Sequence, residues 1–263
     1  MSKQVKKNDQ MEQMQYLVDG EYLTEQEIIN RFGNRVHQLS RRQRGVFNMV
    51  KKVIYELERE AAKYADIGCY FGYFIRKVVE FFPHLQCFGI DYFPDHIRIA
   101  NLLNENGVKY LEMSVYDLDF PDQYFDFITF QEVIEHIDRP VDAVREINRV
   151  LKSGGYLIIS TPNAVAFPNI IYNIFREYRN FYLRFANRSP KVPHEIFFEN
   201  VEWNRHIYAW SVNTLSTLLL SNGFEYVEHR MVANTWWLKL VPGIASELVF
   251  LVKRVASAGK KII

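Results

Sequence analysis

The sequence predicts an α/β protein with a mostly parallel sheet of seven strands, helices on both faces, an N-terminal helical extension and an inserted lid. From residue 64 to about residue 160, short apolar runs alternate with amphipathic stretches, which is typical of parallel strands joined by crossover helices. The composition agrees, because 263 residues of which 48% are apolar and 24% charged can bury one sizeable core.

The first 60 residues are expected to form the helical extension. The first 40 are rich in charge and weakly periodic, so we expect a frayed start followed by short helices. Residues Gln43–Glu60 carry apolar side chains every three to four positions. This spacing predicts an amphipathic helix that packs on the domain that follows.

Residues 61–255 are expected to form the sheet domain. We expect strands at Tyr64–Ile67, Gln86–Asp91, Lys109–Met113, Phe125–Phe130, Tyr156–Ser160, Phe224–Met231 and Glu247–Lys253. We expect helices at Gly72–Phe81, Pro94–Glu105, Pro140–Leu151 and Ser211–Ser221. The third of these helices should stop at a left-handed glycine after Ser153.

The segment at about residues 164–205 lacks this alternation and mixes aromatic residues with arginines. Such a length is unusual for a plain connection. We expect either a helix packed on the core or an inserted lid that covers an acceptor or rests on a membrane surface.

Charge and cysteine content exclude several classes of protein. The 32 Lys and Arg residues nearly balance 31 Asp and Glu residues, so no overall field attracts a polyanion, and nucleic acid is not expected as a partner. Cys69 and Cys87 are too few for a disulfide framework and lack metal-ligand spacing. The N-terminus shows no secretory pattern and no run of 18 apolar residues occurs, so we expect a cytoplasmic protein without a membrane span.

The strongest chemical signal is a glycine turn, Asp66-Ile-Gly68-Cys-Tyr-Phe-Gly72, between a strand and a helix. Gly68 allows the backbone to approach a ligand closely, and Gly72 allows the helix to start close to the strand. The next strand ends in Asp91, whose carboxylate can accept hydrogen bonds from both ribose hydroxyls of an adenosine. The turn lacks the glycine pattern that holds a pyrophosphate, and Asp66 suits a cationic group instead.

Six ordered segments resemble class I S-adenosylmethionine-dependent methyltransferases, and most closely the subgroup of ubiquinone-pathway and glycan-tailoring enzymes. The resemblance is strongest over residues 60–160 and implies a Rossmann-like fold and S-adenosylmethionine as cofactor. The segments are Asp66-Ile-Gly-Cys-Tyr-Phe-Gly72, Gly89-Ile-Asp91, Phe120-Pro-Asp-Gln-Tyr-Phe-Asp126, Gln131-Glu-Val-Ile-Glu-His136, Ile147-Asn-Arg-Val-Leu-Lys-Ser-Gly-Gly155 and Ser160-Thr-Pro-Asn163.

The resemblance also implies which residues bind the cofactor. The turn would hold the methionine end, Asp91 the ribose and Tyr92 the adenine. Two positions depart from the family pattern: Tyr70 replaces the usual central glycine, and Ser114 stands where an aspartate often contacts the adenine amino group, with Asp117 three residues on. The predicted cofactor-binding set is Asp66, Gly68, Cys69, Gly72, Asp91, Tyr92, Asp117 and Gln131.

The segment from Gln131 to His136 follows a predicted buried strand, at the edge where open α/β sheets bind ligands. It could simply be a capped turn that shapes the pocket. His136 could be a general base, because the ordinary pKa of histidine lies near neutrality. A third interpretation is a metal site of Glu132, Glu135, His136 and His206, which resembles the small-RNA 3′-end 2′-O-methyltransferases. We predict His136 as the catalytic residue and no metal.

The predicted function is therefore transfer of a methyl group from S-adenosylmethionine to a small-molecule or glycan acceptor, at a hydroxyl oxygen. Direct displacement needs mainly alignment and exclusion of water, so the cofactor motifs do not specify the acceptor. The alternatives are a metal-assisted methyltransferase acting on RNA 3′ ends and a non-catalytic binding protein that keeps the fold. A nicotinamide dehydrogenase is disfavoured by the missing pyrophosphate pattern.

Overall fold

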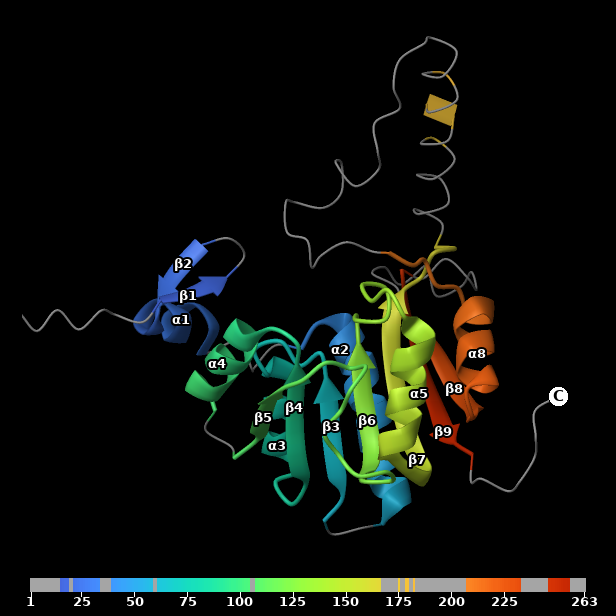
Figure 1. The fold of residues 1–263 in the computed structure, drawn as a ribbon, viewed down its shortest axis with the longest axis horizontal. Helices are drawn as coiled ribbons and strands as arrows, with labels where there is room; N and C mark the ends of the chain where they lie inside the picture. The colour runs from blue at the N-terminus through green and yellow to red at the C-terminus, as the bar shows by residue number, and fades with distance from the viewer. Residues whose placement is uncertain are drawn as a thin grey trace, which may run out of the picture.

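A computed structural model describes residues 15–18, 21–33, 39–58, 61–104, 107–166, 175, 178–179, 182, 207–232 and 246–255. Within these residues the main sheet has seven strands in the order β5-β4-β3-β6-β7-β9-β8 (Figure 1). Strands β3 to β7 pair in parallel, and β9 runs antiparallel to both β7 and β8. The predicted mostly parallel sheet of seven strands is confirmed. The strands are β3 (Lys63–Ile67), β4 (Gln86–Asp91), β5 (Lys109–Glu112), β6 (Phe125–Gln131), β7 (Leu151–Pro162), β8 (Phe224–Val232) and β9 (Glu247–Arg254).

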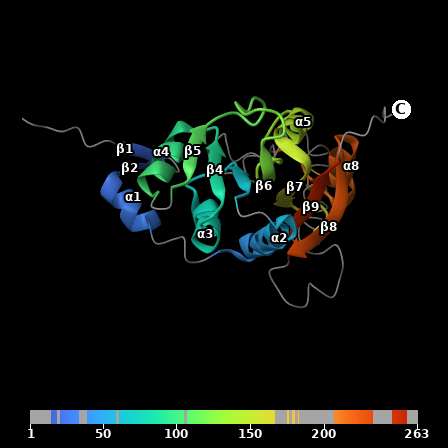
Figure 2. The same ribbon diagram turned by 90° about the horizontal axis from the view of Figure 1, so that it is seen from below.

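Helices cover both faces of this sheet. Side chains of α2, α3 and α4 share one buried cluster with β3, β6 and β7, whereas those of α5 and α8 belong to a second cluster. Figure 2 shows α2 and α3 on one side of the sheet and α5 on the other. The helices are α2 (Arg41–Leu57), α3 (Tyr73–Phe81), α4 (Pro94–Leu102), α5 (Pro140–Val150) and α8 (Val212–Ser221).

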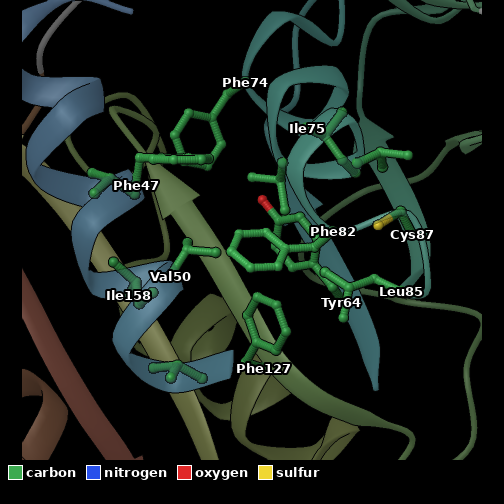
Figure 3. Close-up of a cluster of buried hydrophobic side chains, with 14 of the residues drawn as sticks. Phe47, Val50, Tyr64, Phe74, Ile75, Phe82, Leu85, Cys87, Phe127 and Ile158 are labelled. Carbon is green, nitrogen blue, oxygen red and sulfur yellow. The ribbon is translucent and has the colours of Figure 1, made fainter. Parts of the chain in front are cut away.

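The first cluster fixes the central strands beneath the glycine turn (Figure 3). Tyr64 of β3 stacks on Phe127 of β6 with ring centroids 4.5 Å apart. Phe47 and Val50 of α2 and Phe74 of α3 close the cluster from the helical layer. Full burial of one such side chain contributes about 1.5–3 kcal/mol, so this packing holds the strand ends in place.

The N-terminal region differs from the prediction of short helices. It contains a hairpin of β1 (Gln15–Val18) and β2 (Glu21–Thr24), followed by α1 (Glu25–Phe32). Thr24 caps α1 in a capping box with Glu27. The prediction of helices alone was wrong because Asp19-Gly20, a pair typical of two-residue hairpin turns, separates two short β-favouring runs.

The predicted glycine cap of α5 was also wrong. The helix ends at Val150, and Leu151 has the extended conformation (φ −73°, ψ 142°) and already pairs with Phe125. Gly154 does have a positive φ of 75°, but it lies inside β7. The chain therefore enters the strand before it reaches the glycine.

The expected lid lies mostly outside the described residues. Three aromatic side chains of this segment are described, Phe175, Tyr178 and Tyr182, and all three are exposed. They are therefore not part of the core, whereas the packed-helix alternative would require them to be buried. Within the described ranges, no helix has both the length and the apolar character needed to cross a membrane.

Candidate active site

The predicted site residues meet at the carboxyl edge of the sheet. Asp66, Asp91 and Gln131 lie at or near the ends of β3, β4 and β6, which are neighbouring parallel strands. The arrowheads of these strands point to the same edge in Figure 1. Carboxyl edges of parallel strands are where open α/β sheets bind ligands, so the structure brings these side chains together as predicted.

Asp66 is buried and connected to two neighbours on β6. Its Oδ1 accepts a hydrogen bond of 2.6 Å from the Thr129 hydroxyl and one of 3.4 Å from Gln131 Nε2. Burial raises the pKa of Asp66 to about 7, although these hydrogen bonds act in the opposite direction. A cation beside Asp66 would favour the ionised form. The Gln131 Oε1 atom is buried without a hydrogen-bond partner among the described residues, which leaves it able to accept one from a ligand.

Gly68 and Gly72 are required by the shape of the turn. Their φ angles are +76° and +73°, a region that favours glycine. A Cβ atom at Gly68 would lie within 3.0 Å of Val133 Cγ2, and one at Gly72 would lie 2.7 Å from Tyr110 Cζ. The Gly68 and Cys69 amides both donate to the Ile90 carbonyl, at 2.7 and 3.0 Å. The turn is therefore closely packed and tied to β4.

Asp91 is buried at the end of β4 and accepts hydrogen bonds on both oxygens. The Tyr70 amide donates to Oδ2 at 2.8 Å, and the Phe93 amide donates to Oδ1 at 3.0 Å. The His96 Nδ1 atom also lies 3.0 Å from Oδ1. Tyr70 has a φ of +52°, so it adopts the left-handed conformation in place of the usual glycine. Sequence reasoning missed His96, which only its place soon after Asp91 could have indicated.

The residues expected near adenine lie at the surface. Tyr92 follows Asp91 directly and is 67% exposed, so its ring is available for stacking. Asp117 is exposed, and its amide donates to the Ser114 carbonyl at 3.1 Å. Ser114 and Asp117 thus share one turn, and both positions remain candidates for the adenine contact.

Glu132 begins a turn after β6 and carries an ion pair. Its φ is +52°, and its Oε2 lies 2.8 Å from Arg42 Nη1 on α2. Its Oε1 accepts a hydrogen bond of 3.1 Å from the Ser160 hydroxyl. Burial raises the pKa of Glu132, and the charge of Arg42 opposes this. Sequence reasoning missed Arg42, because the contact joins segments far apart in the chain.

Glu135 and His136 lie side by side in this turn. Glu135 is buried, and its Oε2 accepts a hydrogen bond of 3.1 Å from the Thr161 hydroxyl. Burial, and then the charge of Glu132, raise the pKa of Glu135 to about 8. His136 is partly exposed, with Nε2 3.8 Å from Glu135 Oε1. A carboxyl group with a raised pKa places less negative charge beside the imidazole than an ordinary glutamate would.

The four proposed metal ligands cannot all be placed, because His206 lies outside the described residues. In the described part of the chain, no group of three or more His, Cys, Asp or Glu side chains could hold a metal ion. The Glu132 carboxylate is moreover paired with Arg42. The metal site therefore stays a hypothesis.

A glycine turn with acidic residues at the ends of two neighbouring parallel strands is typical of α/β proteins that bind a nucleoside cofactor. Residues 65–159 match the protein family described as a methyltransferase domain. This match supports the class I S-adenosylmethionine-dependent methyltransferase that the sequence segments indicated. The residues present fit this cofactor, because Asp66 suits a cation and Gln131 has a buried unpartnered acceptor.

Three relatives show which proteins this chain is similar to in sequence. An uncharacterized protein of Methanocaldococcus jannaschii is 27% identical over 60% of this chain and 78% of its own length. A ubiquinone biosynthesis O-methyltransferase of Xanthomonas euvesicatoria is 34% identical over 41% of this chain and 46% of its own. A tRNA U34 carboxymethyltransferase of Campylobacter jejuni is 30% identical over 44% of this chain and 40% of its own. The chain thus spans less than half of the last two proteins.

The fold is shared with solved structures. A methyltransferase of Thermotoga maritima superimposes with a TM-score of 0.53 at 20% identity, over 87% of this chain and 98% of the other. At this identity the likeness concerns the fold and says nothing of the acceptor.

Proposed function

We propose that this chain transfers the methyl group of S-adenosylmethionine to a hydroxyl oxygen of a small-molecule or glycan acceptor, with His136 as general base. The observation that carries the proposal is the position of His136, partly exposed and beside the buried Glu135 in the turn after β6. Similarity to a ubiquinone biosynthesis O-methyltransferase supports oxygen as the accepting atom.

S-adenosylmethionine supplies a methyl group already activated by a cationic sulfur. Asp66 would bind the cationic amino-acid end, and Gln131 would accept a hydrogen bond from it. Asp91 would accept hydrogen bonds from the ribose, Tyr92 would cover the adenine, and Ser114 or Asp117 would contact the adenine amino group. Gly68, Cys69 and Gly72 would form the close-fitting turn.

His136 would take the proton from the acceptor hydroxyl during attack, through an imidazole nitrogen that is uncharged before the reaction. The raised pKa of the buried Glu135 suits this role, because it lowers the negative charge beside the ring. The remaining work is alignment and exclusion of water, for which the segment around residues 164–205 is the proposed lid.

Calorimetric titration with S-adenosylhomocysteine and with NAD tests the cofactor. We expect the first compound to bind and the second not to bind. The reverse outcome would remove the methyltransferase proposal and restore the dehydrogenase. Binding of S-adenosylhomocysteine without methyl transfer to any of a broad panel of hydroxyl-bearing acceptors would favour the non-catalytic binding protein.

RNA is a second candidate acceptor because one relative is a tRNA-modifying enzyme. Metal-assisted methylation of RNA would require Glu132, Glu135, His136 and His206 to share one ion. Methyl transfer measured in excess chelator distinguishes this hypothesis from metal-free methylation of a small molecule or glycan. We expect full activity with chelator present, and loss of activity would make RNA 3′ ends the first acceptors to test.

A further inference from the structure

The hairpin β1-β2 and helix α1, here called the N-terminal module (residues 15–33), pack against the glycine turn and α4. Figure 1 shows the module beside α4, at the same end of the sheet as the turn. Its buried side chains share one cluster with Phe71 of the turn. The buried members of the cluster are Val18, Ile28, Phe32, Phe71, Ile99 and Leu103.

A continuous row of rings leads from the module into the turn. Phe32 of α1 meets Phe71 edge to face, with centroids 5.2 Å apart. Phe71 stacks on Tyr70 at 3.7 Å, and Tyr70 meets His96 of α4 at 4.5 Å. Aromatic pairs of this kind prefer defined relative orientations, so a shift of one ring is passed to the next.

Two neighbouring members of this row, Tyr70 and His96, reach the two oxygens of Asp91. The Tyr70 amide donates to Oδ2 at 2.8 Å, and His96 Nδ1 lies 3.0 Å from Oδ1. Tyr70 holds its amide there in a left-handed conformation (φ +52°) that is unfavourable for a residue with a side chain. Something outside the turn must stabilise that conformation, and the packed rings are in position to do so.

We propose that the N-terminal module positions the Asp91 carboxylate for a ribose diol, acting through Tyr70 and His96, and thereby sets the affinity for the cofactor without taking part in methyl transfer. The inference rests on the proposed function, because it assumes that Asp91 binds the ribose. Phe32 and His96 are positioning residues in this scheme, since each acts through Asp91.

The first test replaces His96. His96→Phe keeps an aromatic ring against Tyr70 and removes the donor to Asp91, whereas His96→Asn keeps a donor near the position of Nδ1. We expect His96→Phe to weaken S-adenosylhomocysteine binding about tenfold, which is the scale of one hydrogen bond to a charged group. We expect His96→Asn to stay within about threefold of wild type.

The second test separates the module from the turn. Phe32→Ala should weaken S-adenosylhomocysteine binding about fivefold, raise the KM for S-adenosylmethionine and leave kcat unchanged. Its matched control is Ile29→Ala on the same helix, because Ile29 is exposed and should change nothing. Amide hydrogen exchange in the free protein gives a readout without cofactor, and Tyr70 should exchange faster in Phe32→Ala. Phe32→Leu replaces this variant if Phe32→Ala fails to fold.

The outcomes distinguish this inference from the proposed function. If wild type fails to bind S-adenosylhomocysteine, the proposed function is wrong, and the exchange of Tyr70 still reports whether the module holds the turn. If wild type binds and folded His96→Phe and Phe32→Ala proteins bind equally well, the positioning role is overturned and the proposed function stands. A lower kcat with an unchanged KM would overturn it as well.

Discussion

Replacement of Gly68 by alanine should destabilise the protein in two separable ways. The φ of +76° costs a residue with a side chain about 1–2 kcal/mol. The new Cβ would also lie within 3.0 Å of Val133 Cγ2, and overpacking of this kind costs about 1–3 kcal/mol. The sum is roughly 2–5 kcal/mol of the free energy of unfolding, and Gly68→Val should abolish cofactor binding altogether.

Urea denaturation of wild type, Gly68→Ala, Val133→Ala and the double variant measures the cost of the backbone conformation and the cost of the collision separately. Val133→Ala removes the methyl group that collides with the new Cβ. In that background Gly68→Ala should cost only the conformational term, roughly 1–2 kcal/mol. Calorimetry with S-adenosylhomocysteine should show weaker binding for Gly68→Ala in both backgrounds, because the altered backbone remains.

Two results would refute this reasoning. A Gly68→Ala protein with the stability and affinity of wild type would mean that the turn is misassigned. Equal costs of Gly68→Ala with and without Val133 would mean that the collision contributes nothing and that the backbone conformation alone requires glycine.

Three further predictions concern the acidic residues and His136. Asp91→Ala should weaken S-adenosylhomocysteine binding by roughly 1.5–3 kcal/mol in calorimetry, the scale of charge-assisted hydrogen bonds, and unchanged affinity in a folded variant would remove Asp91 from the site. His136→Ala should leave that affinity nearly intact and lower turnover roughly 10²–10⁴-fold, whereas turnover within a fewfold of wild type would favour a turn that only shapes the pocket. Burial raises the pKa of Glu135 to about 8 from an ordinary value of 4.5, so the folded protein keeps a proton that the unfolded chain loses above pH 4.5. Folding stability therefore falls as pH rises from about 4.5 to 8. Glu135→Gln does not ionise, so it should reduce this decline by roughly 1–3 kcal/mol when the free energies of unfolding at pH 5 and pH 8 are compared. An equally steep decline in the variant would show that Glu135 ionises normally.

Most of the sheet could be predicted because its central parallel strands, β3, β4 and β6, are buried on both faces. Residues 86–91 show this best, since the predicted strand Gln86–Asp91 has the bounds of β4. Five of its six residues are buried, so the sequence contains an unbroken apolar run that only a central strand needs. The glycines and acidic residues that follow these runs were located for the same reason.

The hairpin and the end of α5 could not be predicted from that pattern. Strands β1 and β2 have four residues each, and β2 is largely exposed, so neither gives a strong periodic signal. At the end of α5, the sequence contains a glycine suited to a helix cap. Pairing of Leu151 with Phe125 takes the chain into β7 first, because the ladder of the sheet outweighs a local preference.

Contacts between distant segments could not be predicted from the sequence either. Arg42 comes from α2 and pairs with Glu132 after β6, 90 residues further along the chain. Local spacing predicts which strand end a side chain follows, but not which helix packs over it. The polar partners that tune the site therefore become visible only once the layers are assembled.

Tyr70 bears on whether the chain has kept its function. Because tyrosine replaces the usual glycine, the sequence alone allows the turn to have lost its binding geometry. In the structure Tyr70 keeps a left-handed backbone, and its amide donates to Asp91. The ring that glycine lacks packs between Phe71 and His96, so the unfavourable conformation is offset by contacts that only an aromatic residue can make. A departure from the glycine pattern therefore argues for lost binding only if the backbone changes with it, and here the substitution ties the turn to neighbours that can adjust its affinity.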